Sequence, residues 1–298
     1  MSGAAVDIII VAYNRRRLVE RSVRSASSLR PRPRIFLVDN GNDGTGHALA
    51  RQDTSLRVLD PGSNLGFGRA VNLAAREGNS EFVLLLNGDA QIEQAAFERL
   101  CAALAANPTV AGVGPRIRDQ RGVLELSVGR TLSVCNEAIF RIAGILYRDG
   151  HGPARTWIER RGAVARSTRS LSAACLLMRR AAFEEAGGFD ERFFLYAEDV
   201  DLCLRLSELG WSWHYVPAAK VVHERGASAA RDRDAAEAHY RASQLQFYGK
   251  HNGAAAGLFL RTYLRLKYGA RWLLTHGERR RQCARILALL ARPSSGSS

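Results

Sequence analysis

A buried strand with a polar end is predicted by the stretch Phe82-Val83-Leu84-Leu85-Leu86-Asn87-Gly88-Asp89-Ala90. Its five apolar residues run without a polar break, which is typical of a strand covered on both faces in a parallel or mixed sheet. A carboxylate that follows such a strand lies at the sheet rim, where open α/β sheets bind ligands. Asp89 is therefore either a ligand of a divalent cation such as magnesium, which takes one or two protein carboxylates beside substrate phosphates, or the cap of the next helix.

Three more strands are expected upstream of this stretch, each leading to polar residues. They cover residues 6–11, 35–38 and 56–59, and the sequence between them predicts helices. Alternating strands and helices are the pattern of a doubly wound α/β domain. If the strands are parallel, their polar ends lie together at one edge of the sheet. Alternatively, these residues share no function, because Asn and Asp are common in turns. The polar ends are Tyr13, Asn14, Asp39, Asn40, Asn64, Asn87 and Asp89.

The composition indicates a globular protein with an unusual charge. Of the 298 residues, 46% are apolar and 24% charged, which is ordinary, but the formal net charge is +14 and nearly all of the positive charge is Arg. This excess favours phosphate-bearing partners, namely nucleotides, nucleic acid or an anionic membrane surface. Five scattered cysteines without a C-x-x-C pair favour a reducing compartment and no zinc site. We expect a cytoplasmic protein, since neither a signal peptide nor a membrane-spanning window is visible.

The segment 115–170 has no readable periodicity and is expected to carry substrate-specific loops. Further along, a helix begins near Glu198, directly after an aromatic cluster, and three carboxylates open it. The helix dipole favours acidic residues there, but three exceed what capping needs. Asp201 is spaced to pair with Arg205 at i, i+4. Glu198 and Asp199 are thus left as candidates for chemistry.

Two short strands are expected at 211–216 and 220–222, and His223 follows the second. A lone histidine is usually structural or solvated. At a strand end beside a metal-binding carboxylate, it becomes a candidate ligand.

The C-terminal part, residues 231–292, is expected to be a basic helical extension, and residues 293–298 a disordered tail. Between 258 and 274, apolar residues at helical spacing alternate with four basic residues, whose charges exclude a membrane span. With its Tyr and Trp residues, this segment is typical of a helix lying in a membrane interface. The alternative is a helix packed on the domain with a solvated basic face.

Six motifs follow one another along residues 6–230. They are Val11-Ala12-Tyr13-Asn14, Val38-Asp39-Asn40-Gly41, Asn64-Leu65-Gly66-Phe67-Gly68-Arg69-Ala70-Val71-Asn72, Asn87-Gly88-Asp89, Gly188-Phe189-Asp190 and Tyr196-Ala197-Glu198-Asp199-Val200-Asp201. In this order they resemble family 2 glycosyltransferases of the GT-A fold, and within them a bacterial rhamnosyltransferase-like branch. The resemblance implies an α/β fold with a Rossmann-like mixed sheet, flanking helices and the C-terminal helical extension.

The resemblance also implies roles for residues. Asp199 would be the catalytic base with Glu198 beside it, and Asp89 and His223 would hold Mg2+ or Mn2+. Asp39 would read a pyrimidine base. The implied nucleotide-sugar-binding residues are Ala12, Tyr13, Asn14, Asp39, Asn64, Gly66, Phe67, Asn72 and Asn87. The sequence departs from the family at the first position of its D-x-D motif, which is Asn87.

The implied reaction is an inverting transfer of a sugar, rhamnose in this branch, from dTDP-rhamnose or, second, a UDP-sugar. The acceptor would be a hydroxyl of a glycan or polyprenyl-linked lipid in cell-surface polysaccharide synthesis, bound by a variable region at 115–170 of a catalytic domain spanning 1–230. A sugar hydroxyl is a poor nucleophile, so a carboxylate must take its proton. A metal at Asp89 would stabilise the charge on the leaving nucleoside diphosphate.

Two other classes remain open. A sugar nucleotidyltransferase shares the α/β core and the metal carboxylate, but no Gly-rich loop bearing Arg and Lys follows the first strand. A non-enzymatic nucleic-acid-binding protein would explain the charge. It would not explain Asp39, Asp89 or Asp199, because carboxylates repel phosphates unless a metal intervenes. We therefore expect no nucleic-acid partner.

Overall fold

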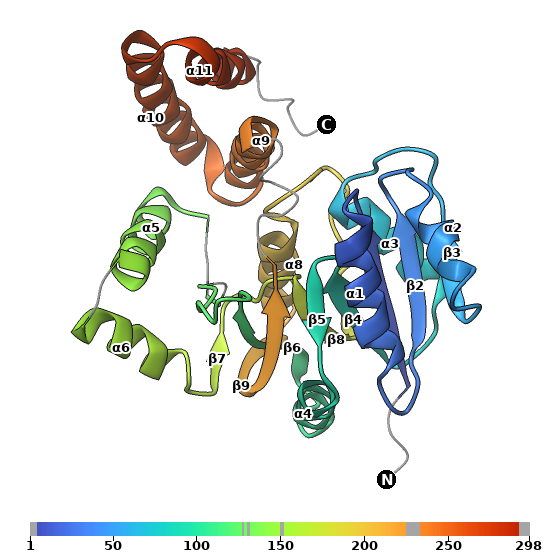
Figure 1. The fold of residues 1–298 in the computed structure, drawn as a ribbon. Helices are drawn as coiled ribbons and strands as arrows, with labels where there is room; N and C mark the ends of the chain where they lie inside the picture. The colour runs from blue at the N-terminus through green and yellow to red at the C-terminus, as the bar shows by residue number, and fades with distance from the viewer. Residues whose placement is uncertain (1–4, 127, 130–131, 150–151, 225–232, 292–298) are drawn as a thin grey trace.

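One mixed sheet of nine strands forms the centre of the structure, a computed structural model that describes residues 5–126, 128–129, 132–149, 152–224 and 233–291 (Figure 1). The strands are β1 (Val6–Ala12), β2 (Arg34–Asp39), β3 (Leu56–Leu59), β4 (Phe82–Asn87), β5 (Ala90–Ile92), β6 (Val110–Arg118), β7 (Arg166–Thr168), β8 (Cys175–Arg179) and β9 (Ser212–His223). Their order is β3-β2-β1-β4-β8-β6-β9-β5, and β7 pairs with β9. The predicted α/β class is confirmed.

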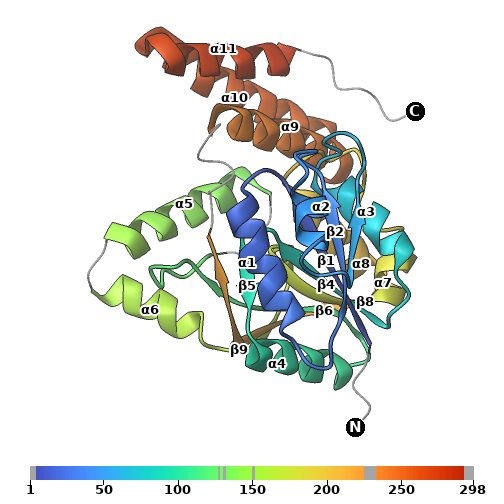
Figure 2. The ribbon, with the colours of Figure 1, turned by 45° about the vertical axis from the view of Figure 1, so that its right-hand side comes forward.

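Helices cover both faces of this sheet. They are α1 (Arg16–Ser27), α2 (Thr45–Ala50), α3 (Phe67–Glu77), α4 (Gln94–Ala105), α5 (Val134–Asp149), α6 (Pro153–Arg161), α7 (Arg180–Glu185), α8 (Glu198–Glu208), α9 (Arg233–His251), α10 (Gly253–Leu274) and α11 (Gly277–Ala291). Helices α1 and α4 pack on one face, and α3, α7 and α8 on the other. Figure 2 shows α9–α11 at the opposite end of the molecule from the N-terminus.

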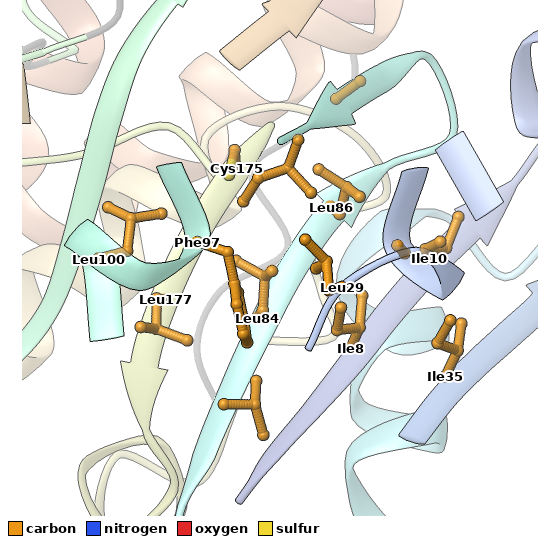
Figure 3. Packing of buried hydrophobic residues seen from close by; sticks show 14 of the residues in the cluster. Ile8, Ile10, Leu29, Ile35, Leu84, Leu86, Phe97, Leu100, Cys175 and Leu177 are labelled. Carbon is orange, nitrogen blue, oxygen red and sulfur yellow. The ribbon is translucent and has the colours of Figure 1, made fainter. Parts of the chain in front are cut away.

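The core explains why the central strands are so apolar. Ile8 of β1, Leu84 of β4 and Leu177 of β8 belong to one buried cluster, in which Leu84 and Leu177 lie beside Phe97 of α4 and Ile8 lies beside Leu29 (Figure 3). The intervening strand residues pack against α3, α7 and α8 on the other face. Because both faces are covered, the strands need apolar residues at every position, as the unbroken run in β4 predicts.

Parallel pairing brings the carboxyl ends of the first strands together. β1 pairs in parallel with β2 and with β4, and β2 with β3. The register sets Ala12 beside Asp39 and Val11 beside Asn87. The predicted edge of polar residues therefore exists, at the end of the sheet on which ligands bind in open α/β folds.

The two strands predicted at 211–216 and 220–222 are one strand, β9. An irregularity interrupts its pairing with β6, since Val216 pairs with Pro115 and Lys220 with Arg116. Pro217 falls inside this irregularity, and a proline has no N–H to continue the hydrogen-bond ladder. The sequence pattern breaks there although the strand continues.

The segment 115–170 is more ordered than the sequence suggests. It contains the end of β6, helices α5 and α6, and β7. A small cluster of Leu124, Tyr147 and Ile158 is buried between these elements. Because these residues are far apart and few, they leave no periodic signal that sequence reading can use.

The C-terminal extension is helical, as predicted, and packs on the loop before α8. Its buried cluster joins Phe247, Leu260 and Ile286 of α9–α11 to Phe193 and Ala197 of that loop. The predicted disordered tail, 293–298, lies outside the described residues. Within the described ranges, each helix is too short or too polar to cross a bilayer.

A buried carboxylate fixes the opposite end of β1. Asp7 is fully buried, and it accepts hydrogen bonds from Arg34 Nε at 2.8 Å, Arg180 Nη2 at 2.7 Å and the Ser80 N–H at 2.9 Å. Burial raises the pKa of Asp7, but hydrogen bonds from the Ser80 side chain and backbone and from Arg34, together with the charge of Arg34, lower it by more, so the pKa lies below its ordinary value. Four segments of the chain thus meet at one ionised group.

We predict that Asp7→Asn lowers the free energy of unfolding by about 3–5 kcal/mol, because the nearly buried Arg180 would lose its counterion. Urea denaturation at pH 7 measures this. Since the folded-state pKa of Asp7 is lowered, its contribution is present above about pH 4 and is lost as the pH falls through the folded value.

The matched control is Asp53→Asn, which breaks an ion pair with the exposed Arg32 and should cost no more than about 1 kcal/mol. Equal midpoints for the Asp7 and Asp53 variants would contradict the proposed anchoring role.

Candidate active site

Asp39 lies at the carboxyl end of β2, and one of its two carboxylate oxygens has no hydrogen-bond partner. It is 1% exposed, and its Oδ2 accepts the N–H of Gly46 at 2.9 Å. Its Oδ1 is buried without a hydrogen-bond partner. A buried acceptor in this state is satisfied when a ligand brings an N–H group.

The chain leaves β1 through a strained turn next to Asp39. Asn14 and Arg15 both have positive φ, 54° and 63°, in the left-handed region that non-glycine residues rarely adopt. Ala12 is buried, its carbonyl accepts the Gly41 N–H at 3.1 Å, and Tyr13 is 46% exposed. Observed strain of this kind is common where a backbone is held for binding.

The loop before α3 is organised by Asn40, whose part in the site the sequence did not reveal. Asn40 is buried; its Nδ2 donates to Asn64 Oδ1 at 2.9 Å, and its Oδ1 accepts the Leu65 N–H at 2.8 Å. Gly66 has φ 81°, and a Cβ there would overlap the Phe194 carbonyl oxygen. Only glycine permits this approach, so the loop rests directly on the segment before α8.

Two predicted nucleotide-binding residues, Phe67 and Asn72, make contacts within the protein. Phe67 packs edge-on against Phe189 with 5.8 Å between ring centroids. Asn72 is buried, its Oδ1 accepts the Phe189 N–H at 2.9 Å, and its Nδ2 donates to the Phe189 carbonyl at 2.9 Å. The structure therefore places both against the Gly187–Glu191 segment and does not bring Asn72 to the carboxyl edge of the sheet.

Asp89 and His223 meet through the pairing of β5 with β9. Ala90 pairs with His223, and Asp89 Oδ1 lies 3.0 Å from His223 Nε2. The other ring nitrogen, Nδ1, lies 2.8 Å from Glu125 Oε2. Burial lowers the pKa of His223, but its hydrogen bonds and the charges of Asp89 and Glu125 raise it more, to about 9. Glu125 was not predicted, because nothing in its sequence spacing connects it with His223.

This arrangement fits a divalent cation. Metal-binding histidines usually have their second ring nitrogen held by a carboxylate, as Glu125 holds His223. Mg2+ and Mn2+ accept few protein ligands when phosphate oxygens and water supply the rest. No group of three or more metal-binding side chains occurs in the described ranges, so Asp89 and His223 would hold the ion together with a diphosphate.

The backbone of Asn87 connects the end of β4, near Asp89, with the segment that contacts the predicted base, Asp199. Its backbone N–H donates to the Ala174 carbonyl at 3.0 Å, and the neighbouring Ala173 N–H lies 3.4 Å from Asp199 Oδ2. Asp199 Oδ1 also accepts the Val200 N–H at 2.9 Å. The half-buried Asp199 thus faces the start of β8, next to the end of β4.

Glu198 is a second buried carboxyl group at the start of α8. It is 6% exposed, and its Oε2 has no hydrogen-bond partner. Burial, followed by the charge of Asp199, raises the pKa of Glu198 to about 8. Two residues with positive φ, Tyr196 at 70° and Ala197 at 73°, precede it. A backbone held in this way sets Glu198 and Asp199 at defined positions.

The C-terminal helix α9 holds this segment in place. Asp201 pairs with Arg205 at 2.8 Å, as predicted, and also with Lys250 Nζ at 2.6 Å and His251 Nε2 at 2.7 Å. Ser243 Oγ donates to the Leu195 carbonyl at 2.8 Å. About fifty positions separate Asp201 from Lys250, so these contacts left no sequence signal.

Comparison with known proteins agrees with the geometry. Residues 4–241 match the family described as Glycosyltransferase like family 2. An N-acetylglucosaminyl-diphospho-decaprenol L-rhamnosyltransferase of Mycobacterium tuberculosis is 33% identical over 267 residues, covering 83% of this chain and 85% of the relative.

Two solved structures share the fold. The mannosyltransferase PcManGT from Pyrobaculum calidifontis, in complex with GDP-Man and Mn2+, has a TM-score of 0.56 at 20% identity, covering 99% of this chain and 76% of that one. GalNAc-T7 with UDP, GalNAc and Mn2+ has a TM-score of 0.54 at 14% identity, covering 74% of this chain and 43% of its own. With the family match along most of its length, the chain belongs to glycosyltransferase family 2 and is a glycosyltransferase of the GT-A fold.

Proposed function

We propose that the enzyme transfers rhamnose from a pyrimidine nucleotide-sugar to a hydroxyl of a lipid-linked glycan, with inversion and with a divalent cation. dTDP-rhamnose is the favoured donor, and a UDP-sugar is second. The relative from M. tuberculosis supports this choice, since its name gives an L-rhamnosyltransferase and a diphospho-decaprenol acceptor. We assign residues 1–230 to the catalytic domain, 115–170 to acceptor binding and the whole enzyme to cell-surface polysaccharide synthesis.

Two unpaired carboxylate oxygens carry the proposal. In the described part of the chain, three buried side-chain atoms lack a hydrogen-bond partner: Asp39 Oδ1, Glu198 Oε2 and Arg116 Nε. Leaving such a group unpaired costs about 1–3 kcal/mol, so a substrate that pairs it gains affinity. Two of the three are residues expected to bind the donor or act on it. Asp39 suits the N3–H of a pyrimidine, and Glu198 suits a sugar hydroxyl.

Asp199 is the better base of the two neighbouring carboxyl groups. Burial and the neighbouring charge of Asp199 raise the pKa of Glu198, which favours its protonated form as a hydrogen-bond donor over its use as a base. Asp199 then takes the proton of the acceptor hydroxyl while the hydroxyl oxygen attacks the anomeric carbon. The bond from that carbon to the donor phosphate breaks on the opposite side, which inverts the configuration.

Asp89 and His223 would hold Mg2+ or Mn2+ against the diphosphate. When bound, this ion would stabilise the negative charge of the leaving nucleoside diphosphate. Glu125 would keep the His223 ring oriented through Nδ1. Family membership sets aside the two other classes considered, a nucleotidyltransferase and a nucleic-acid-binding protein.

We also propose that α10 docks on the cytoplasmic face of a membrane, where a lipid-linked acceptor lies. Leu260, Leu264 and Tyr268 pack inward. Leu266 and Leu273 remain exposed by 70% and 72%. One face of the helix therefore packs on the protein, and the exposed face carries apolar side chains with Arg265 and Arg271, a composition that suits a membrane interface. Docking would weaken with salt, because charges are screened beyond about 8 Å at physiological ionic strength.

We predict that Asp199→Asn lowers kcat by about 10²- to 10⁴-fold, the usual loss for a positioned base, with nucleotide affinity unchanged. Release of nucleoside diphosphate measures turnover. Glu208→Gln, an exposed carboxylate on the same helix, should retain normal turnover. If Asp199→Asn retains near-normal turnover, Asp199 is not the base and Glu198 is the next candidate.

We predict that Asp89→Ala abolishes the tightening of dTDP binding by Mn2+, because the ion would lose its protein carboxylate. Calorimetry with and without Mn2+ measures this difference. The exposed Glu77→Ala serves as the control and should tighten as the wild type does. Equal tightening in the Asp89 variant would remove Asp89 from the metal site.

We predict that Asp39→Asn weakens dTDP and UDP binding by about 10- to 100-fold, because a hydrogen bond to a charged group contributes about 1.5–3 kcal/mol. Fluorescence competition with dTDP, UDP, GDP and ADP measures the loss. Tight binding of GDP or ADP by the wild type, with no response to dTDP or UDP, would contradict a pyrimidine donor.

A further inference from the structure

Exposed apolar side chains are concentrated on three helices. Of sixteen large apolar residues exposed in the described ranges, eleven lie on α5, α6 and α10. They are Ile139, Ile142, Ile145 and Leu146 of α5, Trp157 of α6, and Leu258, Phe259, Tyr263, Leu266, Leu273 and Leu274 of α10. Single exposed apolar residues are normal, but a concentration of this kind marks an interaction surface.

Helix α5 has two distinct faces. Tyr147 is 2% exposed and packs with Leu124 and Ile158, with Ala143 against the same cluster. The exposed isoleucines and Leu146 recur at intervals of three and four residues, which places them together on the other face. The small inner cluster therefore supports the helix and leaves these four aliphatic side chains exposed.

The acidic and the basic side chains of α5 and α6 lie on different faces. The carboxylates of Glu137 and Glu159 point inward, where Glu137 pairs with Arg241 at 3.0 Å and Glu159 pairs with Arg116 and Arg118. Three arginines of α6 are exposed, namely Arg155, Arg160 and Arg161, and Arg155 lies 5.6 Å from the Tyr147 ring centroid. The Arg161 guanidinium lies 5.4 Å from the Trp157 ring centroid. The outward surface is thus apolar and basic.

The α5–α6 pair is fixed to the C-terminal helices. Glu137 of α5 accepts hydrogen bonds from Arg241 and Gln244 of α9, and Arg241 contacts Tyr268 of α10 at 3.2 Å. Figure 1 shows α5 between α6 and the C-terminal helices, with α5 and α6 on the side of the sheet away from β3. Hydrogen bonds thus connect α5, through α9, with α10.

We infer that the outer face of α5 and α6 is a second membrane-binding surface, which inserts aliphatic side chains into an anionic phospholipid bilayer beside α10. Isoleucine and leucine enter the headgroup boundary, Trp157 suits that depth, and the three arginines meet anionic lipid. An acidic protein partner would use the arginines but not a whole aliphatic helix face. The inference rests on the proposed docking of α10 and extends it to the acceptor-binding region.

Flotation with vesicles tests the inference, using neutral phosphatidylcholine and the same lipid with phosphatidylglycerol at low salt. The wild type should float with anionic vesicles only. The double variant Ile142→Asp/Ile145→Asp should bind at least about tenfold more weakly, since each buried aliphatic side chain contributes strongly to transfer from water. Leu209→Asp, an exposed leucine at the end of α8, should bind as the wild type does.

A second variant tests the charges without changing the aliphatic face. Replacing Arg155, Arg160 and Arg161 by Gln should weaken binding about fivefold for each arginine removed. Circular dichroism confirms folding of each variant. Both sets should bind dTDP as the wild type does and lose turnover with an acceptor embedded in vesicles.

The outcomes separate this inference from the proposed docking of α10. If Leu266→Asp/Leu273→Asp loses binding while both sets of α5–α6 variants bind as the wild type does, α10 docks alone and the inference is wrong. If the wild type stays in the soluble fraction with anionic vesicles at low salt, both ideas fail. Binding of the wild type to a soluble acidic protein, with no flotation, would identify a protein partner instead.

Discussion

The parallel pairing of β1 with β2 on one side and β4 on the other is the constraint on which the site depends. Because these strands are buried on both faces and run in one direction, their carboxyl ends must leave the sheet at one edge. The register puts Asp39 beside Ala12. A slip of one residue would turn every side chain of β2 to the opposite face and remove the unpaired oxygen of Asp39 from this edge.

The second half of the site comes from strands that run the other way and from the C-terminal helices. β8 lies antiparallel to β4, so its beginning reaches the same edge and meets Asp199. β9 brings His223 to Asp89 through β5. Helix α9 then secures the start of α8 through Lys250 and Asp201. The C-terminal extension therefore helps to position the segment that carries the candidate catalytic residues.

Sequence reasoning placed a residue correctly in the fold where its position follows from its neighbours along the chain. Asp39 and Asp89 each follow a buried strand, and Glu198 opens a helix, so local pattern places them. Glu125 was missed because it contacts His223 across ninety-eight positions, without any spacing to connect them. The α5–α6 pair was missed because only three buried residues hold its small core together. Asn72 was assigned through family resemblance, yet its amide is already engaged by the Phe189 backbone.

A crystal structure with dTDP and Mn2+ tests the central claim, that one sheet edge holds the donor. The account predicts the pyrimidine N3–H on Asp39 Oδ1 and an anomalous Mn2+ peak between Asp89, His223 and the diphosphate. The hollow of about 380 Å³ lined by Arg76 and Glu191 should stay free of nucleotide. Nucleotide bound in that hollow, with Asp39 Oδ1 still unpaired, would contradict the account.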